Sequence, residues 1–224
     1  MMPVSVEIRR GTDRFLTRSD GHFTRHSFSF GAHYDPDNVA FGPLVCHDDH
    51  RLKAGTGFSD HPHRDVEIVT WVLSGSLLHS DSDGHTGVVR PGEVQVLSAG
   101  SGVTHSEIAG PEGQVRFVQA WLTPSETGTA PTYAVTPVDL VPGELTPVAQ
   151  IGGATFSVAR LGAGDTVTLP KASRVHAFVA GGALQRFSLA EPLSDGDAFR
   201  FTDEPAHTVT AAVPTELLVW AFDS

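Results

Sequence analysis

The chain has 224 residues, 40% of them hydrophobic, which is enough for one large domain or two of about 100 residues each. Its 26 acidic and 15 basic side chains give a formal net charge of −11, which disfavours direct binding to nucleic acid or to an anionic membrane. One cysteine excludes an internal disulfide. No apolar run reaches the ~20 residues that span a bilayer, and residues 1–10 lack the apolar core of a signal peptide. We therefore expect a cytoplasmic protein.

The hydrophobic pattern of the first half predicts strands. Short apolar and β-branched runs recur at intervals of roughly ten residues, and turns rich in Gly, Pro and Asp separate them. No amphipathic pattern is long enough to indicate a substantial helix. This spacing is typical of a β-sandwich or barrel. The expected strands are 66–73, 76–80, 87–89, 94–97 and 115–122.

A second series of strand-like runs follows residues 125–131, a small and polar stretch that we interpret as the linker between two halves. The turn regions 72–77 and 178–184 resemble each other, which suggests two copies of one β-unit. The expected domains are residues 1–124 and 125–224. The expected strands of the second domain are 154–160, 166–169, 175–180, 184–189, 198–201, 207–212 and 216–222.

Two pairs of polar residues carry the clearest chemical signal. His61 and His63 are two residues apart with Pro62 between them, and His105 and Glu107 repeat this spacing in another strand-like segment. Residues at i and i+2 of a strand project from the same face, so two such pairs on neighbouring strands can converge. Three imidazoles and one carboxylate would suit Fe, Mn, Ni, Cu or Zn.

The number of ligands indicates how such a metal would be used. Four protein ligands leave two positions of an octahedral metal open, and open positions suit a metal that meets substrate or dioxygen. A structural zinc site would more often be closed and rich in cysteine, whereas this chain has only Cys46. A single carboxylate on a divalent metal leaves a positive centre, which favours an anionic oxygen ligand.

The sequence around these residues resembles the pirin family of cupin proteins over residues 20–124. The spacing of Gly55, His61, His63, Glu67 and Gly75 resembles the first cupin motif, and that of Gly92, Gly100, Gly102 and His105 resembles the second. The segments that resemble pirins in detail are 26–31 (HSFSFG), 34–36 (YDP), 61–64 (HPHR), 90–95 (RPGEVQ) and 98–107 (SAGSGVTHSE).

The resemblance implies an all-β bicupin, with two tandem jelly-roll barrels. In pirins the N-terminal barrel holds a metal, usually iron, and the family's ligands fall here on His61, His63, His105 and Glu107. Several members are similar to quercetin 2,3-dioxygenases, which open the central ring of a flavonol with dioxygen and release carbon monoxide. A nuclear human member is a transcriptional co-regulator.

Our expected function is therefore a metal-dependent dioxygenase acting on quercetin or a related flavonol. The expected metal is Fe(II), with Mn, Ni, Cu and Zn as alternatives, and Glu107 is the expected catalytic base for the 3-hydroxyl proton. The alternative is a non-catalytic, iron-bearing redox sensor or co-regulator that acts through a protein partner. A third interpretation is an isomerase that uses the metal as a Lewis acid. We expect a monomer.

The other histidines are expected to have no role in metal binding. The second half has no His-x-His pair, so we expect its barrel to be metal-free. His176 and His207 are expected to be packing or surface residues. Residues 47–50 (HDDH) are predicted to be a solvated loop, and His79 and His85 to be exposed beside a hairpin.

The remaining candidates are one cysteine, two charged residues and four aromatic residues. Cys46 is expected to be a small buried hydrophobe, and Glu67 to belong to the barrel wall or to support the ligands. Arg64 either orients an oxygen of the substrate or forms a surface ion pair. Four aromatic residues are candidates for the lining of a pocket, with a place in the core as the alternative for each: Phe28, Phe41, Phe58 and Trp71.

Overall fold

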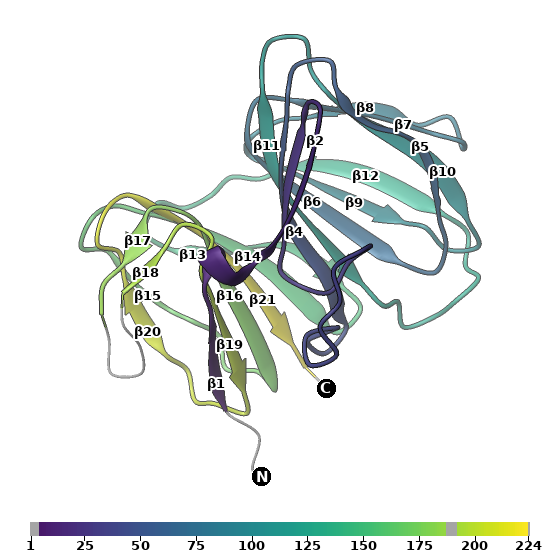
Figure 1. Ribbon diagram of the computed structural model, residues 1–224. Helices are drawn as coiled ribbons and strands as arrows, with labels where there is room; N and C mark the ends of the chain where they lie inside the picture. Colours follow the sequence, from purple (N-terminus) through teal and green to yellow (C-terminus); the bar gives the residue numbers. More distant parts are fainter. Residues whose placement is uncertain (1–4, 187–191, 224) are drawn as a thin grey trace. The chain divides into compact units, whose positions relative to one another are not determined.

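The computed structural model describes residues 5–186 and 192–223, and within them it contains β-strands, one short 3-10 helix and no α-helix. The all-β prediction is confirmed. Contacts divide the chain into two compact units (Figure 1). The first unit comprises residues 15–138, and the second combines the residues up to 14 with those from 139 onward. None of the described residues belongs to a helix long and apolar enough to cross a membrane.

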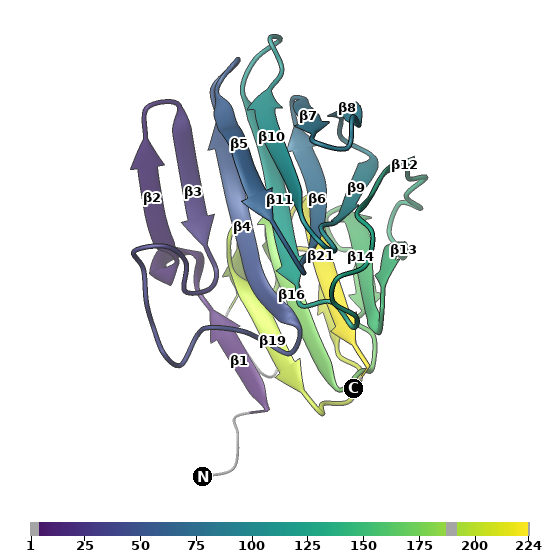
Figure 2. The same cartoon turned by 90° about the vertical axis from the view of Figure 1, so that its right-hand side faces the viewer.

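The first unit contains two antiparallel sheets. The larger has the order β12-β9-β6-β11-β4-β3-β2, and the smaller has the order β5-β10-β7-β8 (Figure 2). The strands of the larger sheet are β2 (Phe15–Ser19), β3 (His22–His26), β4 (Leu44–Leu52), β6 (Glu67–Ser74), β9 (Glu93–Ser98), β11 (Val115–Leu122) and β12 (Thr132–Pro137). Those of the smaller are β5 (Gly57–His63), β7 (Leu77–Asp81), β8 (Thr86–Val89) and β10 (Val103–Ala109).

One apolar cluster joins the two sheets of the first unit. Val72 and Phe117 contribute to it from the larger sheet, and Leu77 and Ala109 from the smaller. All four side chains are almost fully buried. Because both sheets bury one face in the same cluster, each strand is held with alternate residues inward. The inward-facing polar residues of β5, β7 and β10 lie further along the same face of these strands.

The second unit is built on a six-stranded antiparallel sheet of order β1-β19-β16-β21-β14-β13. Two short two-stranded sheets, β15-β20 and β17-β18, accompany it, and the 3-10 helix η1 (Gly11–Asp13) follows β1. The strands are β1 (Val6–Arg9), β13 (Leu145–Ile151), β14 (Ala154–Leu161), β15 (Thr166–Thr168), β16 (Arg174–Gly181), β17 (Ala183–Leu184), β18 (Leu193–Ser194), β19 (Ala198–Thr202), β20 (Thr208–Thr210) and β21 (Thr215–Phe222).

The histidines predicted to pack in the second unit lie apart from each other. His176 is fully buried on β16, on the face opposite to the Ala177 and Val179 side chains of the apolar core. His207 is half-buried; its ring stacks on Phe201 at 4.8 Å and contacts Glu204 at 3.2 Å. These positions agree with a packing role for both.

Most of the strands that the apolar runs predicted are present in the structure. The boundary between the two units, however, differs from the one expected at residue 124. β12 follows the expected linker and pairs with β9 of the first unit, while β1 at the N-terminus pairs with β19 of the second. The units therefore divide at 14/15 and 138/139. Of the expected strand 184–189, β17 covers the start, and residues 187–189 lie outside the described part.

The prediction of a solvated loop at residues 47–50 is wrong, because these residues form the middle of β4 and are buried. The two carboxylates are paired with side chains of neighbouring strands. Asp48 accepts a hydrogen bond from His26 Nδ1 at 2.6 Å, and Asp49 binds Arg116 through two contacts of 3.0 and 2.7 Å. Buried charges are tolerated when they are paired in this way. Cys46, on the same strand, is buried as expected.

Gly57 lets β5 approach β10 closely. A Cβ atom placed at Gly57 would collide with the carbonyl oxygen of Glu107 and would lie 2.7 Å from the Cα of Ile108. Both atoms belong to the backbone of β10, so they cannot rotate away.

We predict that Gly57→Ala destabilises the protein by about 1–3 kcal/mol, the usual cost of overpacking. Thermal unfolding followed by circular dichroism would measure the effect. Gly181→Ala is the matched control, since a Cβ at that strand position meets nothing within 4 Å. Equal unfolding temperatures for the two variants would contradict the prediction.

Candidate metal centre

The two predicted polar pairs lie side by side on neighbouring strands. In the antiparallel pairing of β5 with β10, His61 is opposite His105 and His63 is opposite Val103. The ring centroids of His61 and His105 are 4.4 Å apart, and that of His63 is 4.9 Å from each of them. Each ring offers a nitrogen within 4.8 Å of the other two. The structure therefore brings three of the four predicted ligands into one cluster.

A β-bulge adjusts the strand beside this cluster. The register shifts between His105 and Glu107, so that Glu107 is opposite Phe58 on β5. The extra residue reverses the alternation of β5 and lets the ring of Phe58 contact His61, with centroids 6.3 Å apart. The same ring meets His50 at 5.2 Å. An apolar edge therefore lies next to the candidate ligands.

The nitrogen atoms of the cluster have the chemistry that a transition metal requires. His61 Nδ1 lies 2.8 Å from the carbonyl oxygen of Ser59, so this nitrogen carries the proton and leaves Nε2 with a lone pair. The Nε2 atoms of His63 and His105 are buried and have no hydrogen-bond partner within the described residues. Buried polar atoms are rarely left unsatisfied. Three converging imidazoles with nitrogen atoms available in this way fit a bound divalent metal.

Burial keeps two of these rings neutral. Burial, followed by the neighbouring His61, lowers the pKa of His63 to about 4. Burial, followed by the neighbouring His61 and His63, lowers the pKa of His105 to about 3. The neutral form of imidazole is the one that binds metal, so these rings do not need to release a proton at neutral pH.

Glu107, the fourth predicted ligand, lies next to His105 and is almost completely buried. Its oxygen atoms group with His105 and His79. Gln119 Nε2 donates hydrogen bonds to both carboxylate oxygens, at 2.9 and 3.0 Å, and Trp121 Nε1 donates to Gln119 Oε1 at 2.8 Å. Burial raises the pKa of Glu107, against the opposite effect of the Gln119 hydrogen bonds. The carboxyl is thus held in place and able to take up a proton.

His79 is placed differently from the prediction, which had it exposed. It is almost completely buried, and its ring stacks on Tyr133 with centroids 4.1 Å apart. β7 pairs with β10 on the side opposite β5, so that Glu107 is opposite His79 and His105 is opposite Asp81. The signal was present in the sequence, because His79 and Asp81 repeat the i and i+2 spacing of the other two pairs. His85 is exposed, as predicted.

The aromatic residues that the sequence suggested lie in different surroundings. Phe28 and Trp71 are fully buried in the core, whereas the ring of Phe58 contacts the candidate ligand His61. Trp121 was not predicted. Its ring lies 4.9 Å from that of His63 and 5.5 Å from the partly exposed Phe30.

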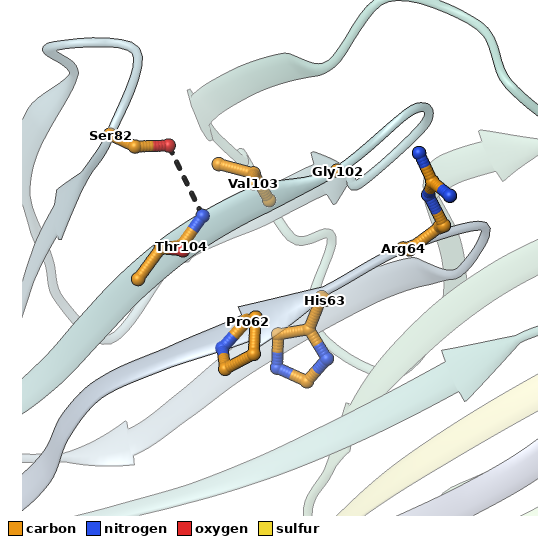
Figure 3. A pocket seen from close by; sticks show the side chains of 7 residues that line it. All are labelled: Pro62, His63, Arg64, Ser82, Gly102, Val103 and Thr104. Carbon is orange, nitrogen blue, oxygen red and sulfur yellow. Dashed lines mark hydrogen bonds between the residues drawn. The ribbon is translucent and has the colours of Figure 1, made fainter.

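A hollow of about 400 Å³ lies at the end of β5 and the start of β10 (Figure 3). Pro62, His63 and Arg64 line it from one strand, and Ser82 accepts a hydrogen bond from the Thr104 amide on the other side. Arg64 is exposed, and its Nε donates to the carbonyl oxygen of Ser101 at 2.9 Å. His63 lines the hollow and is also a member of the histidine cluster. Glu67 accepts a hydrogen bond from the Ser98 hydroxyl at 2.9 Å, in the larger sheet.

Solved structures with the same fold define a class. A crystal structure of a bacterial pirin from Escherichia coli in complex with nickel(II) has a TM-score of 0.88 to this chain, at 26% identity, and covers 98% of this chain and 100% of its own. The chain is thus a bicupin with a cluster of histidines that could bind a metal.

The sequence comparisons agree. The Pirin family model matches residues 9–122. A Mycobacterium tuberculosis protein named "Putative quercetin 2,3-dioxygenase" is 45% identical over 234 residues, covering 98% of this chain and 96% of its own. An Escherichia coli protein named quercetin 2,3-dioxygenase is 40% identical over 151 residues, 66% of this chain and 65% of its own. The chain belongs to the pirin family.

We predict that His61→Ala and His105→Ala each weaken the binding of a divalent transition metal by at least tenfold, because each removes one of three converging lone pairs. Competition titration with a chromophoric chelator would measure the affinity. His85→Ala is the control, since His85 is exposed and outside the cluster. Equal affinities for the three variants would contradict the assignment.

The lowered pKa values also predict how the metal-free protein responds to acid. His63 and His105 bind protons only below about pH 4 and 3 when folded, but below about pH 6.5 when unfolded. Between these limits the unfolded chain binds more protons, so stability falls as the pH is lowered from 7.5 to 4.5. Unfolding temperatures across this interval should fall less for the double variant His63→Gln/His105→Gln. Parallel profiles for the two proteins would contradict the prediction.

Proposed function

We propose that the first unit is a metal-dependent dioxygenase that cleaves quercetin or a related flavonol with O2. In this proposal His61, His63, His105 and Glu107 hold one divalent metal, with iron(II) as our choice and Mn, Ni, Cu and Zn as alternatives. The observation that carries the proposal is the convergence of three imidazoles beside a buried carboxylate. The names of the relatives support the choice of substrate.

The charge of the donor set favours an anionic oxygen ligand. A bound redox metal supplies a positive centre for such an oxygen and the means to activate dioxygen. Burial keeps His63 and His105 neutral, and an imidazole binds a metal in its neutral form, so Glu107 alone would offset the charge of the metal. A deprotonated 3-hydroxyl of a flavonol matches the remaining positive charge.

Glu107 is the proposed catalytic base. Its pKa is raised by burial, which makes the carboxylate a better proton acceptor than an exposed glutamate. The proton of the 3-hydroxyl passes to a carboxylate oxygen, and the two hydrogen bonds from Gln119 hold the group while it changes charge. Gln119 is itself fixed by Trp121 and by Thr70, whose Oγ1 lies 3.1 Å from Gln119 Nε2.

The aromatic rings beside the ligands fit a planar, apolar substrate. Phe58 contacts His61 on one side of the cluster, and Trp121 contacts His63 on the other. Aromatic edges and faces pack favourably against aromatic ligands. These side chains would hold a flavonol with its oxygen atoms toward the histidines.

The test is oxygen uptake by the iron-loaded protein with quercetin, combined with measurement of carbon monoxide. We expect one O2 consumed for each flavonol opened and one CO released. Glu107→Gln, which is nearly isosteric, should reduce the rate at least a hundredfold, and His61→Ala should abolish it. Carbon monoxide separates ring cleavage from simple oxidation of the flavonol.

Full iron occupancy without oxygen uptake would overturn the proposal. It would favour the alternative of a redox sensor, for which the measurement is partner binding in the two oxidation states of iron. Turnover without oxygen in the zinc-loaded protein would favour the isomerase. A cytoplasmic location and a monomeric state are further predictions, to be checked by cell fractionation and by size-exclusion chromatography with light scattering.

A further inference from the structure

We propose that His79 and Asp81 are positioning residues that fix the tautomer and the ring orientation of His105. This inference rests on the proposed metal site and extends it from the ligands to their support. It assigns a role to the buried histidine that the proposed reaction does not use.

Three strands bring the groups together. β10 lies between β5 and β7, and the inward residues of β7 at this level are His79 and Asp81. His105 Nδ1 lies 3.5 Å from His79 Nδ1, and His79 Nε2 lies 3.2 Å from Asp81 Oδ2. The side chains of His79 and Asp81 are both almost completely buried. The contacts form a chain from His105 to the β7–β8 hairpin.

With Asp81 ionised and His79 neutral, the hydrogen bonds of this chain run in one direction. An ionised carboxylate accepts hydrogen bonds, so His79 must carry its proton on Nε2 and donate it to Asp81. A neutral His79 then has a lone pair on Nδ1, which accepts from His105 Nδ1–H. His105 is left with its lone pair on Nε2, the buried atom without a hydrogen-bond partner within the described residues. The position of Asp81 thus selects the nitrogen that His105 offers to a metal.

The hairpin fixes Asp81 as an acceptor. Its Oδ1 accepts hydrogen bonds from the backbone amides of Asp83 and His85, at 3.0 and 2.9 Å. The turn that aims these amides inward includes Gly84, whose φ of +90° favours glycine. The carboxylate is therefore held by the backbone before any metal binds. His85 approaches Asp81 from the exposed side, with its Nδ1 3.0 Å from Oδ2.

Tyr133 fixes the plane of the His79 ring. The two rings are stacked with an interplanar angle of 13°, and the Tyr133 hydroxyl donates to Gln95 Oε1 at 3.3 Å. A ring held on its face and at both nitrogens cannot rotate freely. Removal of such supporting groups typically lowers metal affinity by about 10–100-fold.

The experiment uses the full-length protein loaded with Cu(II) as a spectroscopic probe. His79→Phe keeps a flat ring on Tyr133 but removes both nitrogens, and Asp81→Asn keeps His79 but removes the charge of its acceptor. His85→Phe is the matched control, because His85 also contacts Asp81 but is exposed. Circular dichroism and the unfolding temperature identify any variant that fails to fold, in which case Asp81→Asn carries the test.

Two readouts are needed. Competition titration gives the affinity, and pulsed electron paramagnetic resonance gives the number of bound imidazoles and the quadrupole coupling of each remote nitrogen, which depends on its hydrogen bond. We expect His79→Phe to bind Cu(II) about 10–100-fold more weakly. Both His79→Phe and Asp81→Asn should shift the coupling of one remote nitrogen without changing the number of bound imidazoles.

Wild-type affinity and couplings in His79→Phe would overturn the inference. Loss of one bound imidazole in His79→Phe, with Asp81→Asn unchanged, would also overturn it, since His79 would then be a ligand. The result is distinct from a failure of the proposed activity. A protein that shows the expected copper signals but, when loaded with iron, consumes no oxygen with quercetin would support the positioning role and contradict the dioxygenase.

Discussion

The site depends on the pairing of β10 with β5 on one side and β7 on the other. Each of these strands carries two polar residues at i and i+2, and the register brings all three pairs to the inner face. A slip of one residue in β10 would turn His105 and Glu107 outward. Leu77 and Ala109, paired at the other end of β7 and β10, belong to the apolar core and resist such a slip. The hydrophobic contacts thus set the geometry of the polar groups.

Burying a carboxylate and several imidazoles together costs free energy, and the larger sheet offsets part of this cost. Gln119 on β11 donates hydrogen bonds to Glu107 and to Thr70 on β6, and Gln95 on β9 forms another hydrogen bond with Glu107. These side chains come from three adjacent strands, so the network is as rigid as the sheet. The Nε2 atoms of His63 and His105 are outside it. A metal would therefore satisfy the groups that the protein itself leaves without partners.

The sequence predicted those parts of the fold and site that depend on residues close together in the chain. β6 and β11 are rich in apolar and β-branched residues, and the pairs at His61 and His105 have a spacing that only extended strands bring to one face. β4 was missed because its central residues are polar, and the partners that allow their burial, such as Arg116 for Asp49, lie far away in the sequence. Hydropathy cannot register such pairings.

His79 was missed for a different reason. The turn that follows Asp81 is rich in Asp, Ser and Gly and predicts an exposed hairpin, which is correct for His85. The strand enters the interior immediately before that turn. A carboxylate held by turn amides can point inward while the turn itself is solvated. The exposed hairpin and the buried His79 are therefore parts of one arrangement.

The interiors of the two units are filled differently. Inward positions of the second unit are filled by a large apolar cluster that includes Phe199, Phe201 and Leu217. Such a core stabilises its unit by burial alone, with no polar group to satisfy. The first unit gives part of its interior to His79, His105 and Glu107, which are almost completely buried. Since buried polar groups lower stability unless they are paired, the first unit is the one that gains most from a bound metal.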